Sequence, residues 1–149
     1  MIHVRPATSA DAQVIADFNA AMALETEHVR LDPPTVLEGV RAGIADAAKA
    51  VYFVAECQGK IAGCCMVTHE WSDWRNGDIW WLQSVYVHPD HRRRGVFRAL
   101  YRHVESAARR AGAVALRLYV ERDNARAKST YTALGMTLTH YDVMEQKLR

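Results

Sequence analysis

The sequence predicts an α/β protein in which helices flank a central mixed sheet. Two patterns indicate this class: short β-branched and aromatic runs typical of strands, and longer segments whose apolar residues recur at helical spacing. Their order is one strand, two helices, three strands, a helix, a strand, a helix and a final strand or pair of strands. Because the chain has 149 residues, half of them hydrophobic, we expect one domain spanning residues 1–149.

The first part of the chain indicates a strand followed by two helices. Residues 2–7 (IHVRPA) have the composition of a short strand that ends near its proline. Thr8 or Ser9 can cap a helix whose apolar positions continue to about Leu24. The next residues interrupt the helical spacing, which resumes over residues 34–44 as a second helix.

Three strands are expected in the middle of the chain. Residues 50–57 and 61–71 are apolar and β-branched and flank the turn QGK, so they predict a hairpin. A second turn signal, RNG, leads into residues 78–87 (DIWWLQSVYV). That segment is apolar at both odd and even positions, which is typical of a central strand covered on both faces.

The last part of the chain predicts a β-α-β unit and a further helix. Residues 97–111 carry an apolar stripe at helical spacing, and Gly112 ends the helix. Residues 113–120 are an apolar strand, and residues 124–134 form a short helix. Residues 136–148 indicate one or two terminal strands.

Composition restricts the class of function. The formal net charge is only +2, so we expect no nucleic-acid partner. No apolar run is long enough for a secretory signal or a membrane span, so we expect a cytoplasmic protein with no membrane partner. The three cysteines, Cys57, Cys64 and Cys65, lack metal-ligand spacing, so we expect buried, reduced thiols and no metal.

Three consecutive arginines and a glycine, Arg92, Arg93, Arg94 and Gly95, join the central strand to the next helix. Unpaired amides at a helix N-terminus favour an anion, and glycine allows the backbone to turn where a side chain would obstruct. The arginines add charge suited to a polyphosphate. The turn lacks the spacing of a Walker loop or a dinucleotide fingerprint, and by itself it is equally consistent with a solvated basic turn.

Two motifs carry a family resemblance. The segment VYVHPDHRRRGVFRAL resembles the GNAT superfamily of N-acetyltransferases, in which a strand precedes Arg/Gln-x-x-Gly-x-Gly/Ala and a helix. Arg92, Gly95 and Phe97 fall on the motif positions, although Phe97 stands where the family usually has Gly or Ala and also fits the apolar stripe of the helix. The segment LRLYVERDNARAKSTYTALGM resembles the family's next motif. The resemblance implies a GNAT-like acyl-CoA N-acyltransferase fold.

The resemblance also implies acetyl-CoA as co-substrate. In this family the arginine turn holds the pyrophosphate and the preceding strand pairs with the pantetheine arm. The implied cofactor-binding residues are Val85, Tyr86, Val87, Arg92, Arg93, Arg94, Gly95, Val96, Phe97 and Asn124. Asn124 is also placed to cap the helix that follows, and Val85 to Val87 are equally explained by burial in a central strand.

Tyr131 is the candidate catalytic residue. It lies seven residues after Asn124, nearly two helical turns along and on the same side of the short helix. The pattern alone would make it a core aromatic. A departing thiolate needs an acid, however, and the family carries a general-acid tyrosine at the matching position.

The acceptor implied by the family is a primary amine of a small molecule or peptide, acetylated by direct transfer in a ternary complex. Five carboxylates are candidates for a base or a relay, and the sequence does not rank them: Glu25, Glu27, Glu70, Asp73 and Asp78. We expect Glu27 and Asp73, in polar loops, to contact the substrate. Trp71, Trp74, Trp80 and Trp81 could line the acceptor pocket, form a homodimer contact or pack in the core. The alternative function is a non-catalytic acyl-CoA-binding sensor or regulatory domain.

Overall fold

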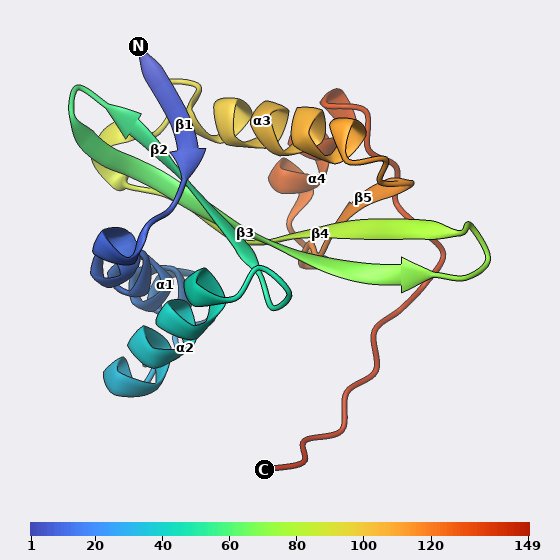
Figure 1. The fold of residues 1–149 in the computed structure, drawn as a ribbon, viewed down its shortest axis with the longest axis horizontal. Coiled ribbons are helices and arrows are strands. Elements are labelled where there is room, and N and C mark those ends of the chain that lie inside the picture. The colour runs from blue at the N-terminus through green and yellow to red at the C-terminus, as the bar shows by residue number, and fades with distance from the viewer. The chain divides into compact units, whose positions relative to one another are not determined.

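The computed structural model describes residues 1–149 and contains a five-stranded sheet in the order β1-β2-β3-β4-β5 (Figure 1). The strands are β1 (Ile2–Pro6), β2 (Val51–Cys57), β3 (Lys60–Ser72), β4 (Gly77–Val87) and β5 (Ala115–Leu118). The helices are α1 (Ala12–Glu27), α2 (Pro33–Ala45), α3 (Val96–Arg110) and α4 (Ala125–Ala133). Neighbouring strands are antiparallel except β4 and β5, which are parallel and joined through α3. The predicted α/β class with a mixed sheet is confirmed.

The chain divides into two compact units, Met1–Leu118 and Tyr119–Arg149. The first unit contains the whole sheet and helices α1, α2 and α3, and the second contains α4 and the C-terminal residues. The expectation of a single domain stays a prediction.

A capped turn starts α1. Thr8 and Asp11 form a capping box around a short 3-10 turn, in which the Asp11 carboxylate accepts a hydrogen bond from the Thr8 amide at 2.8 Å. The helix then continues to Glu27, three residues beyond the predicted end at Leu24, and stops at His28 in the left-handed region. Glutamates are good helix formers, so the acidic residues that were expected to break the helix extend it.

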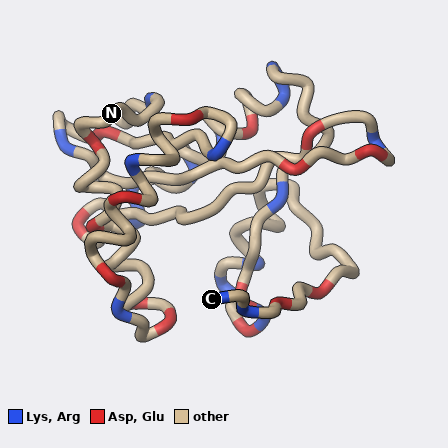
Figure 2. The backbone as a smooth tube through the Cα atoms, turned by 60° about the horizontal axis from the view of Figure 1, so that its bottom comes forward, with Lys and Arg blue, Asp and Glu red and all other residues tan.

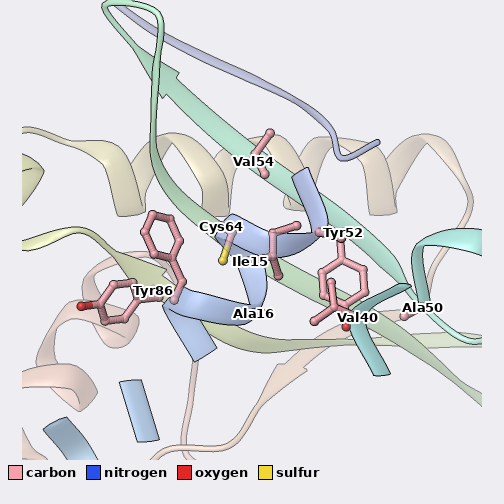
Figure 3. Packing of buried hydrophobic residues seen from close by; sticks show 10 residues of the cluster. Ile15, Ala16, Val40, Ala50, Tyr52, Val54, Cys64 and Tyr86 are labelled. Atoms are coloured by element: carbon pink, nitrogen blue, oxygen red, sulfur yellow. The ribbon is translucent and has the colours of Figure 1, made fainter. Parts of the chain in front are cut away.

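The sheet has a helical layer on each face. Helices α1 and α2 contribute Ile15, Phe18 and Val40 to an apolar cluster with the sheet residues Tyr52, Val54, Cys64 and Tyr86 (Figure 3). On the other face lies α3, and a Cβ on Gly63 would lie 2.7 Å from the carbonyl oxygen of Tyr86 and 3.1 Å from Val96 of α3. Gly63 is therefore required by the close approach of its neighbours.

Two of the three thiols are buried. Cys64 and Cys65 are 1% and 0% exposed, whereas Cys57 is only partly buried. Burial raises the pKa of Cys64 to about 12 and also raises the pKa of Cys65, so both remain thiols at neutral pH. The predicted burial is confirmed for this pair.

The C-terminal prediction is wrong. Residues 136–148, expected to form one or two strands, contain none, and β5 is shorter than the predicted 113–120. Leu138 and Met144 are 77% and 95% exposed. A strand requires a partner for its backbone groups, which apolar composition alone does not supply, so composition was not sufficient here.

Candidate active site

The arginine turn provides a helix N-terminus that can bind an anion. Gly95 is the N-cap of α3 with φ 83° and ψ 11°, and no side chain caps the helix. Arg93 also adopts a left-handed backbone, with φ 64°, and both Arg93 and Arg94 are exposed. Because the first amides of a helix lack intrahelical partners, they converge with the helix dipole on the same point in front of Val96. Two exposed guanidinium groups add charge beside it.

Arg92 lies in the same turn but is held by other groups of the protein. Its Nε donates to the carbonyl of Val87 at 2.9 Å, and its Nη2 donates to Glu25 Oε2 at 2.9 Å. Its guanidinium carbon lies 5.4 Å from the centroid of the Tyr86 ring, within cation-π range. Arg92 thus connects the end of β4, the end of α1 and the turn.

Glu25 accepts a second hydrogen bond, from the Tyr86 hydroxyl at 2.8 Å. Figure 3 shows this hydroxyl pointing away from the apolar cluster that holds the Tyr86 ring. Hydrogen bonds from Arg92 and Tyr86 lower the pKa of Glu25. The pKa of Tyr86 is raised, mainly by burial and to a smaller extent by its hydrogen bond to Glu25. At neutral pH Glu25 is therefore a carboxylate with two donors, which makes it a poorer candidate for the base than its residue type suggested.

An irregularity in β4 separates its two halves. Cys64 pairs with Tyr86 and Met66 with Gln83, so β4 carries one more residue than β3 across this interval. Ser84 adopts φ 50°, the left-handed backbone of a bulge residue. As a consequence Gln83 and Tyr86 lie on the same face of the sheet although they are three residues apart.

Beyond the bulge, one edge of β4 has no strand beside it. The parallel pairing of β4 with β5 runs from Ile79 with Ala115 to Leu82 with Leu118 and ends there. Backbone groups on the β5 side of residues 83–87 therefore lie outside the strand pairing of the sheet, and such groups can pair with a ligand that has amide groups. This open edge leads directly toward the arginine turn.

The predicted site residues divide between the two units. Residues 85–87 and 92–97 lie together at the end of β4 and the start of α3. Tyr86 and Val96 are buried there, and the ring centroids of Phe97 and Tyr101 are 6.1 Å apart. Asn124 and Tyr131 belong to the second unit. The Asn124 side chain accepts from the Ala127 amide at 3.0 Å, which confirms the predicted cap. Burial raises the pKa of Tyr131.

The two residues expected near the substrate lie far apart along the chain and in different elements. Glu27 is the last residue of α1, and Asp73 lies in the turn between β3 and β4. The contact of Glu25 with Arg92 and the bulge at Ser84 were not predicted from the sequence. Gln83 and Ser84, a polar pair inside an otherwise apolar segment, were the one available signal for the bulge.

Charges of both signs are interspersed along the backbone, as Figure 2 shows. None of the helices has the length and apolar character that spanning a membrane requires. No group of three or more His, Cys, Asp or Glu side chains is placed to hold a metal ion.

Residues 18–136 match the Acetyltransferase (GNAT) family. A possible acetyltransferase from Clostridium difficile 630 is 39% identical, with a TM-score of 0.93 over 100% of this chain and 99% of that chain. A predicted acetyltransferase with acetyl-CoA from Clostridium acetobutylicum shares the fold, with 15% identity and a TM-score of 0.79 over 99% and 97% of the two chains. So does a transcriptional regulator from Bacillus halodurans C-125, with 18% identity and a TM-score of 0.85 over 99% and 100%.

No curated protein sequence matches the chain. The family match nevertheless covers most of the residues and includes the arginine turn, the open edge of β4 and α4. By sequence and by fold, the chain belongs to the GNAT acetyltransferase family.

Proposed function

We propose that the protein is an N-acetyltransferase that moves an acetyl group from acetyl-CoA to a primary amine of a small molecule or peptide. One observation carries the proposal: the open edge of β4 and the anion-binding turn before α3 follow each other along the chain. A ligand with a polyphosphate at one end and an amide-containing arm at the other fits this succession, and acetyl-CoA is such a molecule.

The arginine turn binds the pyrophosphate in this proposal. Arg93 and Arg94 supply charge, and the amides after Gly95 supply donors. The amide of Phe97 can serve although the family usually has Gly or Ala there, because a first-turn helical backbone does not require glycine. The arm then runs along the open edge formed by Val85, Tyr86 and Val87, and Asn124 provides a further contact by resemblance to the family.

Acetyl transfer is direct, within a complex of enzyme and both substrates. Acetyl-CoA supplies the thioester, so that the carbon–nitrogen bond forms and the carbon–sulfur bond breaks. A backbone amide between Val85 and Val87 stabilises the negative charge that develops on the carbonyl oxygen. Tyr131 gives its phenolic proton to the departing thiolate, and the proton lost by the amine passes to a carboxylate or a water relay.

Glu27 and Asp73 remain the proposed contacts of a cationic acceptor. Asp73 follows Ser72, which pairs with Gly77, and Gly77 is seven residues from Ser84 on β4. At about 3.3 Å per strand residue this is roughly 23 Å, so Asp73 would contact the distal part of a long acceptor rather than the reacting amine. Trp71 and Trp74, 62% and 92% exposed beside it, would serve the same role or a homodimer contact.

The test is a thiol-release assay with acetyl-CoA and a panel of small amines, antibiotics and peptides, combined with calorimetry of acetyl-CoA. We expect tight binding and turnover of at least one amine, with the Arg93→Ala, Arg94→Ala double variant losing affinity. A second candidate, a cofactor-binding regulatory domain, is favoured by the occurrence of this fold in a protein named a transcriptional regulator. Acetyl-CoA binding without turnover of any amine would favour that candidate.

A further inference from the structure

A second group of polar side chains lies on the sheet where the open edge of β4 begins. The inference that we draw from this group rests on the proposed function. With the pyrophosphate at the start of α3, the arm of acetyl-CoA runs back along residues 87 to 83, and the acetyl group comes close to the last rung between β4 and β5. That rung joins Leu82 and Leu118. The acceptor must therefore approach the sheet beside this point.

A polar cluster, which we name the Arg117 cluster, is centred on the preceding pair of the ladder, Trp81 with Arg117. It consists of Thr68, Glu70, Trp81, Gln83 and Arg117. Thr68 pairs with Trp81 and Trp81 with Arg117, so the three lie side by side on one face of three neighbouring strands. Met66, on the same side of β3, packs against the cluster of α1 and α2, so the Arg117 cluster lies on the face that these helices partly cover.

The contacts within the cluster fix a cation and an anion against one aromatic side chain. The Trp81 indole N–H donates to Glu70 Oε1 at 3.0 Å, and Glu70 Oε2 lies 3.9 Å from Arg117 Nη1. The guanidinium carbon of Arg117 lies 5.9 Å from the centroid of the Trp81 ring. Gln83, next to the bulge, donates to the Thr68 hydroxyl.

The ion pair of Arg117 with Glu70 is by itself a weak explanation for this arrangement. The Arg117 and Glu70 side chains are 23% and 48% exposed, and their contact at 3.9 Å is longer than a hydrogen bond. An ion pair of this length with a half-exposed carboxylate contributes little to folding, because water screens the Glu70 charge and both long side chains lose entropy. A guanidinium held over an indole beside a site of acyl transfer is, by contrast, well suited to bind a carboxylate.

We propose that the Arg117 cluster recognises a carboxylate on the acceptor, so that the acceptor is an amine that also bears an acid group several bonds away. Arg117 binds the carboxylate, and Glu70 positions Arg117 and Trp81. Trp81 lies three residues from Ser84, about 10 Å along the strand, and this span sets the separation of the acid from the reacting amine. Short peptides and ω-amino acids have this chemistry, whereas polyamines do not.

Three probes of equal length test the proposal: aminohexanoate, its amide and hexanediamine, which differ only in the distal group. We expect the KM of aminohexanoate to be lower than that of the other two by about tenfold or more, because a site built for one polar group rejects analogues that lack it. Arg117→Gln should remove this preference, Arg117→Lys should keep part of it, and Arg41→Gln, at an exposed arginine of α2, should leave it intact.

Binding of aminohexanoate in the presence of CoA, measured by calorimetry, tests the site without turnover. Loss of this binding in Arg117→Gln, with the melting temperature kept, supports the proposal whether or not any probe is acetylated. A preference for hexanediamine, or no detectable binding, or binding equal in wild type and Arg117→Gln, overturns it. Absence of thiol release with every amine, while aminohexanoate still binds through Arg117, would instead count against the proposed transferase function.

Discussion

The Glu25 carboxylate accepts a hydrogen bond from Arg92 Nη2 at 2.9 Å and thereby joins the end of α1 to the turn before α3. Arg92 is one of the three arginines that the sequence assigns to a pyrophosphate, yet its guanidinium is already bound by Glu25 and the Val87 carbonyl. Two roles follow. In the first, Arg92 stays bound to Glu25 and holds the turn in a shape that binds the anion. In the second, Arg92 breaks its contact with Glu25 and binds the anion with its own guanidinium group.

Replacing Glu25 by Gln distinguishes the two roles. If Arg92 braces the turn, Glu25→Gln weakens acetyl-CoA binding, by up to about tenfold or 1.4 kcal/mol. If Arg92 is a phosphate ligand restrained by Glu25, the same variant binds acetyl-CoA more tightly. We expect weaker binding by calorimetry. Glu38→Gln, which removes an equal charge from an exposed position of α2, is the control and should bind as wild type does.

Gly95 offers a test of the helix N-terminus. Its φ of 83° disfavours a side chain, although a Cβ there would meet no atom within 4 Å. Gly95→Ala should therefore cost roughly 1–2 kcal/mol of folding free energy without a steric clash. Gly112, at the other end of α3 with φ 78° and equally open space, is a matched control. Both variants should lose similar stability in urea, but only Gly95→Ala should lose acetyl-CoA affinity. Equal affinities would separate the turn from cofactor binding.

The sequence predicted the order of elements well because each depends on local periodicity. The apolar runs of β2, β3 and β4 and the stripe of α3 are visible within single windows of residues, and their bounds lie close to those expected. The arginine turn was also visible, since Gly95 and its neighbours are consecutive.

Features that join distant residues were not predictable in this way. Glu25 and Arg92 are separated by 67 positions, and no pattern links them. Trp81, Arg117 and Glu70 meet only because β3, β4 and β5 are neighbours in a fixed register. The prediction of C-terminal strands failed for the same reason, because a strand depends on a pairing partner and not only on the composition of residues 136–148.

Asp11 should make folding sensitive to acid. Its carboxylate is nearly buried and receives two hydrogen bonds from Arg5, at 2.8 and 3.1 Å, which lower its pKa below the ordinary 3.8. A lowered folded-state pKa means that the stabilisation is complete above pH 3.8 and is lost as the pH falls through the lower folded-state value. Asp11→Asn should cost about 2 kcal/mol at pH 7.

Urea unfolding at pH 7, 4.5 and 3 checks this expectation. The difference in unfolding free energy between wild type and Asp11→Asn should be constant between the two higher pH values and shrink at the lowest. Asp17→Asn, at an exposed position of α1, should follow wild type throughout. A difference that grows on acidification would contradict the sign argued for Asp11.

Tyr131 carries the prediction on chemistry. As a general acid it must be protonated at neutral pH, and burial helps because it raises the pKa of the phenol above the ordinary 10.0. Tyr131→Phe keeps the ring and removes only the hydroxyl, so we expect kcat to fall by about 10²-fold or more, with acetyl-CoA affinity and melting temperature little changed.

In wild type the fall in kcat at alkaline pH should begin only above about pH 10, since a raised pKa extends the range of the neutral acid. Tyr101→Phe, at a phenol buried in α3, is the control for loss of a hydroxyl and should keep its kcat. If Tyr131→Phe turns over at the wild-type rate, Tyr131 contributes packing and the proton for the thiolate comes from another group.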